Sequence, residues 1–145
     1  MAQAKDRITC HILDTSLGRP ARGVHVRLSL EPTPSSSPVH HGAPALAGPP
    51  RVFESQTDDD GRVKTWLPYS SPTSSGEVPV YTLEDVLGGI KGTSRWTLSF
   101  DTAGYYGEEN TFFPEVTVVF RVEEGQTYHV PLLLAPYSYS TYRGS

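Results

Sequence analysis

The sequence is poor in cysteine, in positive charge and in long apolar runs, and each shortage excludes a class of protein. Its single cysteine, Cys10, cannot support an intrachain disulfide framework or a cysteine-rich metal site. A formal net charge of −4 at pH 7 disfavours nucleic-acid binding, which needs a basic surface to neutralise phosphates. No apolar run approaches the roughly 18 to 20 residues of a membrane-spanning helix. We therefore expect neither a nucleic-acid partner nor a membrane partner.

We read no clear targeting signal at either end of the sequence. The first ten residues, MAQAKDRITC, lack the apolar stretch of a secretory signal, and the ending Arg143-Gly144-Ser145 differs from the peroxisomal SKL. A single cysteine also fits a reducing compartment. We expect a cytoplasmic or peroxisomal protein, and the length of 145 residues favours one domain over 1–145.

Alternation of apolar and polar residues dominates what is present, and it predicts β-strands with one face toward a core. Five segments show it clearly: 8–13, 24–30, 96–100, 116–122 and 128–134. Weaker candidates lie at 52–57, 63–67 and 137–142. The Asp60-Gly61 pair favours a hairpin between the strands at 52–57 and 63–67. About eight short strands with little helix indicate an all-β sandwich.

Two segments interrupt this pattern. Residues 31–50 are rich in Pro, Ser, Ala and Gly, a composition that buries too little apolar surface to offset its ordering entropy, so we expect a mobile loop. Residues 68–94 begin in the same way but then favour a short helix, with Thr82 as N-cap and Gly88-Gly89 as its end. A further helical turn is expected at 101–106, capped by Asp101.

Two histidines are candidates for proton transfer. His11 alternates with Ile8, Cys10 and Ile12, so it points away from the core, and His129 does the same in its own strand. The plain interpretation is a pair of solvent-facing imidazoles. They become a candidate site if those outer faces meet, for example where a second subunit joins, because partly desolvated imidazoles exchange protons near neutral pH.

Arg62 and the C-terminal segment are the other candidates. Arg62 follows the Asp-Gly turn and is either a surface arginine or a planar donor to a carbonyl or developing oxyanion. The Tyr- and Ser-rich segment after Pro136 ends in a cation, a glycine and a carboxylate. It is either a polar edge strand or the wall of a pocket.

Other chemistries have weaker support. His40-His41 is an adjacent pair rather than a spaced ligand set, and no third ligand is suggested for a zinc ion at His11 and His129. No nucleophile-elbow motif marks a serine for a Ser-His-Asp triad. We expect no metal.

The candidate residues lie in four stretches: ITCHILDTSLGRPARGVHVRL, TDDDGRV, LSFDTAGYY with FFPEVTVVF, and YHVPLLLAPYSYSTYRGS. Together these stretches resemble the 5-hydroxyisourate hydrolases, the enzymatic relatives of transthyretin. The terminal YRGS is the most specific element, because the hormone-carrying transthyretins lack it. The resemblance covers nearly the whole chain except the inserts at about 31–50 and 68–94.

The resemblance implies an all-β, eight-stranded transthyretin-like (prealbumin) β-sandwich, paired into dimers and then into a homotetramer, without a cofactor. It implies hydrolysis of a small molecule, 5-hydroxyisourate, to 2-oxo-4-hydroxy-4-carboxy-5-ureidoimidazoline in urate breakdown. Residues that match the family's catalytic and substrate-binding positions are His11, Arg62, His129, Tyr142, Arg143, Gly144 and Ser145.

For the mechanism, we expect His129 to act as base toward water while His11 orients the water or shares the proton. This division stays open because coupled groups titrate as a pair. Arg62 and Arg143 would bind carbonyls and the oxyanion, and Tyr142 and Ser145 would position the ring or the water. The competing interpretations are a transthyretin-like carrier of a small aromatic ligand and a structural β-sandwich without a site.

Overall fold

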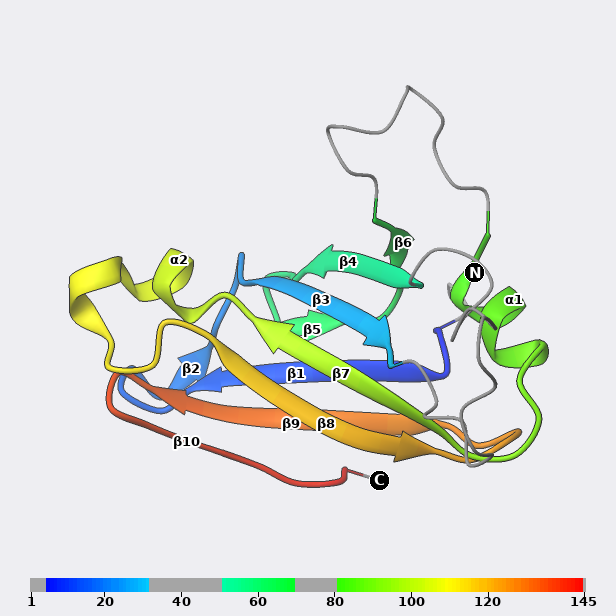
Figure 1. Cartoon of the computed structure of the whole chain (residues 1–145). Coiled ribbons are helices and arrows are strands. Elements are labelled where there is room, and N and C mark those ends of the chain that lie inside the picture. The colour runs from blue at the N-terminus through cyan, green and yellow to red at the C-terminus, as the bar shows by residue number, and fades with distance from the viewer. Residues whose placement is uncertain (1–4, 32–50, 70–80, 145) are drawn as a thin grey trace, which may run out of the picture.

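The alternating apolar residues form the inner faces of two β-sheets that pack on each other (Figure 1). The computed structural model describes residues 5–31, 51–69 and 81–144. Sheet A has the order β10 (Ser138–Thr141), β9 (Tyr128–Ala135), β1 (Ile8–Asp14) and β2 (Arg19–Pro20), with β5 (Arg62–Val63) also paired to β1. Sheet B has the order β6 (Leu67–Pro68), β4 (Val52–Gln56), β3 (His25–Leu30), β7 (Ser94–Phe100) and β8 (Val116–Val122).

The core lies between the sheets and is built from the residues that the alternation assigns to it. Every second residue of β1, from Ile8 to Ile12, is fully buried. The same holds for two inward residues of β3, Val26 and Leu28, and for the inward residues of β7 from Trp96 to Phe100. The largest of these side chains are Trp96, Phe53, Phe100, Ile8 and Ile12. The prediction of an all-β sandwich is confirmed.

The strands differ from the prediction in number and in one connection. The expected strand at 63–67 is two short strands, β5 and β6, which belong to different sheets, and β2 is an additional two-residue strand. The hairpin expected at Asp60-Gly61 is wrong, because β4 pairs with β3 and β6 whereas β5 pairs with β1. The turn therefore carries the chain from sheet B to sheet A.

That turn is held by its own polar groups. The Oδ1 atom of Asp58 accepts hydrogen bonds from the backbone N–H groups of Asp60 and Arg62, at 2.9 and 3.0 Å. Gly61 has φ of +73°, and its carbonyl accepts the Ile12 N–H at 2.8 Å. The turn thus docks on β1 and fixes the position of the residue that follows it.

Two helices close the ends of the sandwich (Figure 1). α1 (Leu83–Gly88) begins at Thr82 with a capping box to Asp85, and it buries Leu83 and Leu87 against the core. α2 (Thr102–Tyr106) begins at Asp101, which caps Gly104, and a 3-10 turn follows at Glu108–Asn110. Both predicted helical segments are confirmed.

The predicted inserts fall largely outside the described residues. The loop expected at 31–50 is described only at its first residue, and of the insert at 68–94 residues 70–80 are not described. The rest of the second insert holds α1 and the start of β7. Within the described ranges, no helix is long and apolar enough to cross a bilayer.

The Asp58–Gly61 turn yields a stability prediction. A Cβ at Gly61 would lie 2.4 Å from the Ile12 carbonyl oxygen, whereas at Gly18, with φ of +69°, it would meet nothing within 4 Å. Both Gly→Ala changes incur backbone strain of roughly 1–3 kcal/mol, but Gly61→Ala adds the clash. Urea unfolding should show a clearly larger loss of unfolding free energy for Gly61→Ala than for Gly18→Ala. Equal losses of unfolding free energy in the two variants would show that the turn is not tightly packed against β1.

Candidate functional site

The outer face of sheet A carries two histidines on neighbouring strands. β1 and β9 run parallel, with Thr9 opposite His129 and His11 opposite Pro131. Because side chains of a strand alternate between faces, both imidazoles lie opposite the buried residues of their strands. Their ring centroids are 6.3 Å apart and the ring planes make an angle of 29°. The two predicted histidines therefore meet within one chain.

This arrangement corrects one expectation from the sequence. We expected the imidazoles to come together where a second subunit joined the outer face, but the pairing of β1 with β9 already brings them together. Thr9 and His129 are 120 positions apart, and local alternation cannot show which distant strand lies beside which.

Arg62 joins the two histidines because β5 is the other neighbour of β1. In the antiparallel pair of β1 with β5, His11 lies opposite Arg62. Residues opposite each other point to the same side of a sheet, so Arg62 shares the outer face with His11. Three predicted site residues, from strands far apart in the sequence, are thus neighbours.

The C-terminal segment runs beside His129. The Gly144 N–H donates to the His129 carbonyl at 2.8 Å, and the two residues form an antiparallel bridge. A Cβ on Gly144 would lie 2.8 Å from the His129 Cδ2 atom, so the imidazole packs where only glycine leaves room. The same register puts Tyr142 on the face of His129. Ser145 lies outside the described residues.

Arg143 is placed differently from the other predicted residues. It lies between Tyr142 and Gly144 in the register and therefore points to the opposite side of the strand. Its guanidinium carbon lies 4.8 Å from the centroid of the Tyr128 ring, a cation–π contact. The Tyr128 side chain is buried on the core side of β9, and Arg143 lines a second hollow together with His129, so its assignment to the substrate carbonyls stays a prediction.

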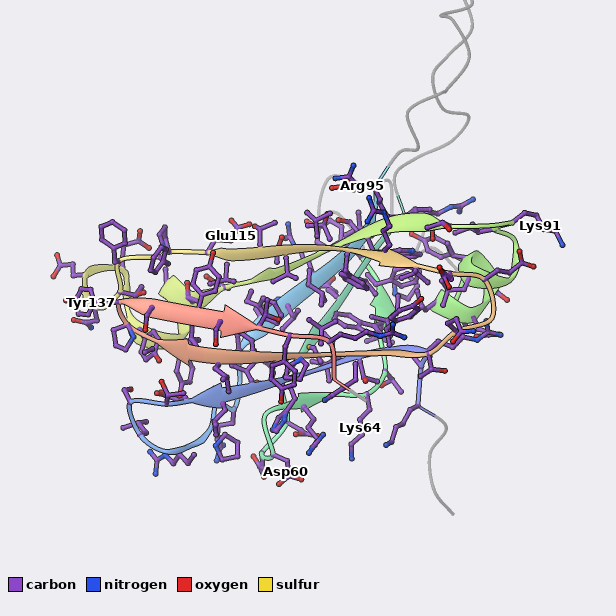
Figure 2. The ribbon with its side chains drawn as sticks, turned by 90° about the horizontal axis from the view of Figure 1, so that it is seen from below. Asp60, Lys64, Lys91, Arg95, Glu115 and Tyr137 are labelled. Carbon is purple, nitrogen blue, oxygen red and sulfur yellow. The ribbon has the colours of Figure 1, made fainter. Side chains whose placement is uncertain are left out.

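A hollow of about 300 Å³ opens at this face. Its lining includes Lys5, Thr9, Asp60, Arg62, Lys64 and His129. Asp60 and Lys64 project from the outer side of sheet A, away from Arg95 and Glu115 on the other sheet (Figure 2). Small-molecule sites are hollows of roughly this size or larger, with a few placed polar groups.

A second hollow of about 420 Å³ lies on the other side of the C-terminal segment, toward the open edge between the sheets. Phe120 of β8, Tyr128 and Arg143 contribute to its lining, and His129 borders both hollows. The C-terminal segment therefore separates a polar space from a more apolar one.

Burial and positive charge keep both imidazoles in the neutral form at neutral pH. Burial lowers the pKa of His11, and the Arg62 guanidinium lowers it further, against smaller opposing effects of Asp58 and Asp60. Burial also lowers the pKa of His129, followed by the charges of Arg62, His11 and Lys5. A neutral imidazole has a lone pair that can accept a proton, so the cluster has the state that a general base requires.

Sequence reasoning missed Thr9 as a member of the site. Its Oγ1 atom is 2.8 Å from the Nδ1 atom of His129 and 3.4 Å from the Tyr128 carbonyl oxygen. The local signal was present, because Thr9 shares the outer face of β1 with His11. Its partner on β9 follows only from the strand order.

The cluster combines proton acceptors with a fixed cation, which suits the addition of water to a carbonyl group. An imidazole can take the proton of water, and the guanidinium can stabilise negative charge on the carbonyl oxygen. Among the residues that the structure describes, no third metal-ligating side chain joins His11 and His129.

The chain is similar to known proteins along almost its whole length. A family model described as the HIUase/Transthyretin family matches residues 8–144. The chain is 44% identical over 147 residues to the uric acid degradation bifunctional protein TTL of Arabidopsis thaliana, covering 99% of this chain but only 38% of that protein. It is 36% identical over 143 residues to a probable 5-hydroxyisourate hydrolase of Schizosaccharomyces pombe, covering 95% of this chain and 90% of the other.

A solved structure agrees with these similarities. The structure of Klebsiella pneumoniae 5-hydroxyisourate hydrolase superposes with a TM-score of 0.58 and 26% sequence identity, covering 95% of this chain and 98% of that one. With the family match over 8–144, the full-length relatives and the shared fold, the chain belongs to the HIUase/Transthyretin family.

Proposed function

We propose that the protein hydrolyses 5-hydroxyisourate to 2-oxo-4-hydroxy-4-carboxy-5-ureidoimidazoline in urate breakdown. The observation that carries this proposal is the cluster of His11, Arg62 and His129 on one outer face, in a chain of the HIUase/Transthyretin family. Relatives of this chain carry the name 5-hydroxyisourate hydrolase. A carrier of an aromatic ligand needs an apolar channel and has no use for depressed imidazole pKa values beside a guanidinium.

The reaction requires one proton transfer in each direction. The oxygen of water adds to a carbonyl carbon of the six-membered ring, and an imidazole takes the proton that water loses. The C–N bond of the ring then breaks, and the proton passes to the leaving nitrogen. The second proton of the water stays on the new carboxyl group and passes to solvent when that group ionises to a carboxylate, so atoms and charge balance without a redox partner.

His129 is the base in this proposal, and His11 orients the water or shares its proton. The 6.3 Å between their ring centroids leaves the two rings close enough to act on one small substrate. Arg62 stabilises the oxyanion, and Tyr142 borders the ring of the substrate from the C-terminal segment. Gly144 contributes close packing against His129, and Ser145 stays a prediction as a catalytic group. No cofactor takes part.

We further propose that the protein forms a homotetramer built as a dimer of dimers, in which the outer faces of two sheets A enclose the hollow. Two features support self-association. Among the described residues, the outermost strands β8 and β10 each have one edge without a partner strand, and exposed edges tend to pair. Large side chains are exposed on or beside these strands, namely Val119, Tyr137, Tyr139 and Tyr142.

The role of the base gives a first kinetic prediction. His129→Ala should lower kcat/KM by roughly 10²- to 10⁴-fold, the usual effect of losing a general base. His25→Ala, on sheet B and exposed, is the matched control and should keep wild-type turnover. The measurement is the decay of freshly generated 5-hydroxyisourate, followed by absorbance. Wild-type rates in His129→Ala would remove His129 from the mechanism, and ligand binding without turnover by the wild type would favour a carrier.

The Arg62 charge gives a prediction for pH dependence. Since the neutral imidazole is the active form and both pKa values lie below the ordinary value, kcat/KM should fall only when pH drops through that depressed range. Arg62→Gln removes a positive charge, raises both pKa values and should move this acidic limb to higher pH, besides lowering the maximal rate. Arg22→Gln, which keeps Arg62, should leave the limb in place. An unchanged limb in Arg62→Gln would show that Arg62 does not set the charge state of the histidines.

The assembly gives a third prediction. Light scattering should give about four times the chain mass at micromolar concentration, and activity per chain should fall when dilution dissociates the assembly. A monomer with full activity would contradict the proposal that a second copy encloses the site.

A further inference from the structure

Thr9 lies between two polar groups of the neighbouring strand. It is 9% exposed, and its Oγ1 atom is 2.8 Å from Nδ1 of His129 and 3.4 Å from the carbonyl oxygen of Tyr128. The register that places Thr9 opposite His129 fixes both distances through the backbone. The Thr9 side chain therefore holds the imidazole at one of its two ring nitrogens.

The hydroxyl has a single proton, and this restricts how the contact can be made. The Tyr128 carbonyl can only accept a hydrogen bond, whereas Nδ1 can donate or accept. If the hydroxyl donates to the carbonyl, its oxygen accepts from Nδ1–H, and all three groups are satisfied. In this arrangement the proton of the neutral imidazole lies on Nδ1, and Nε2 keeps its lone pair.

The reverse arrangement is unsuited to catalysis at the hollow. If the hydroxyl donated to Nδ1, the ring proton would lie on Nε2, and the nitrogen farthest from the strand would have no lone pair to take a proton from water. The first arrangement also suits the protonated ring, because Nδ1–H keeps its acceptor when Nε2 gains a proton. No hydrogen bond then has to reorganise during the reaction.

We propose that Thr9 is a positioning residue that fixes His129 in the Nδ1–H tautomer, with Nε2 as the basic atom that faces the hollow. This inference rests on the proposed function, because it gives the same imidazole its orientation and its tautomer. Thr9 lines the hollow, but the role proposed for it is to hold the imidazole and not to exchange the reacting proton. A β-branched hydroxyl residue suits this position on β1, because branching at Cβ restricts χ1 and so holds the hydroxyl in one place.

Two substitutions separate the hydroxyl from the shape of the side chain. Thr9→Val keeps the volume and branching but has no hydroxyl, whereas Thr9→Ser keeps the hydroxyl. Nitrogen NMR of the imidazole rings in the full-length protein reports the tautomer directly, and His129→Gln identifies the signals of His129. The wild type and Thr9→Ser should show the Nδ1–H form. Thr9→Val should shift the population toward Nε2–H and lower the pKa of His129, since the imidazolium loses an acceptor.

Kinetics supply the second readout. Thr9→Val should lower kcat by roughly 10- to 100-fold, the range known for residues that orient a metal-binding histidine. KM should stay nearly unchanged, and the acidic limb of the pH profile should move to lower pH. Thr9→Ser should stay within a few fold of wild type. A loss of kcat that Thr9→Ser shares, or one without a tautomer change, would assign Thr9 to packing and overturn the inference.

The NMR spectra and the kinetic measurements test the role of Thr9 and the proposed function separately. A wild type that shows the Nε2–H tautomer, or a Thr9→Val spectrum equal to the wild type, overturns the role of Thr9 even where hydrolysis is fast. An Nδ1–H tautomer that depends on Thr9, in a protein that does not hydrolyse 5-hydroxyisourate, confirms the hydrogen bond and refutes the proposed function. If Thr9→Val does not fold, the wild-type and Thr9→Ser spectra still decide the tautomer.

Discussion

The parallel pairing of β1 with β9 is the constraint on which the site depends. It places Thr9 opposite His129, brings the His11 ring to 6.3 Å from the His129 ring and leaves the other edge of β1 for β5, which carries Arg62. A shift of either strand by one residue would turn the histidine of that strand toward the core. The packed inner residues of β1 and β9 oppose such a shift, so the same burial that stabilises the sandwich also sets the geometry of the site.

Because side chains alternate along the strands, the two faces of sheet A have different roles. The inner residues form the core, and the outer residues form a polar cluster in which burial first, and then the Arg62 charge, lowers both imidazole pKa values. The C-terminal segment obeys the same rule. Tyr142 and Gly144 lie on the face of His129, whereas Arg143 stacks on Tyr128 at the open edge. Arg143 is therefore placed to anchor the segment rather than to contact the substrate from this face.

Much of the fold and part of the site could be predicted from the sequence. What could not be predicted has a physical cause. Period-two alternation and helix caps are local signals, so the inward residues of β1 and both helices were predicted. Strand order is not local. The hairpin at Asp60-Gly61 was therefore wrong, and the two histidines meet within one chain rather than only where a second subunit joins. Thr9 was missed, and the role of Arg143 toward the substrate stays a prediction. The family resemblance supplied what alternation could not, namely which outward side chains belong together. The cytoplasmic or peroxisomal location stays a prediction.

A crystal structure of the protein with a stable planar purinedione analogue of the substrate would test the central claim most directly. The analogue should lie on the outer face of sheet A, with a carbonyl oxygen within hydrogen-bond distance of the Arg62 guanidinium and an ordered water or ring atom at Nε2 of His129. An analogue bound elsewhere, or one that contacts neither Arg62 nor the two imidazoles at saturating concentration, would contradict the claim that these strands form the catalytic site.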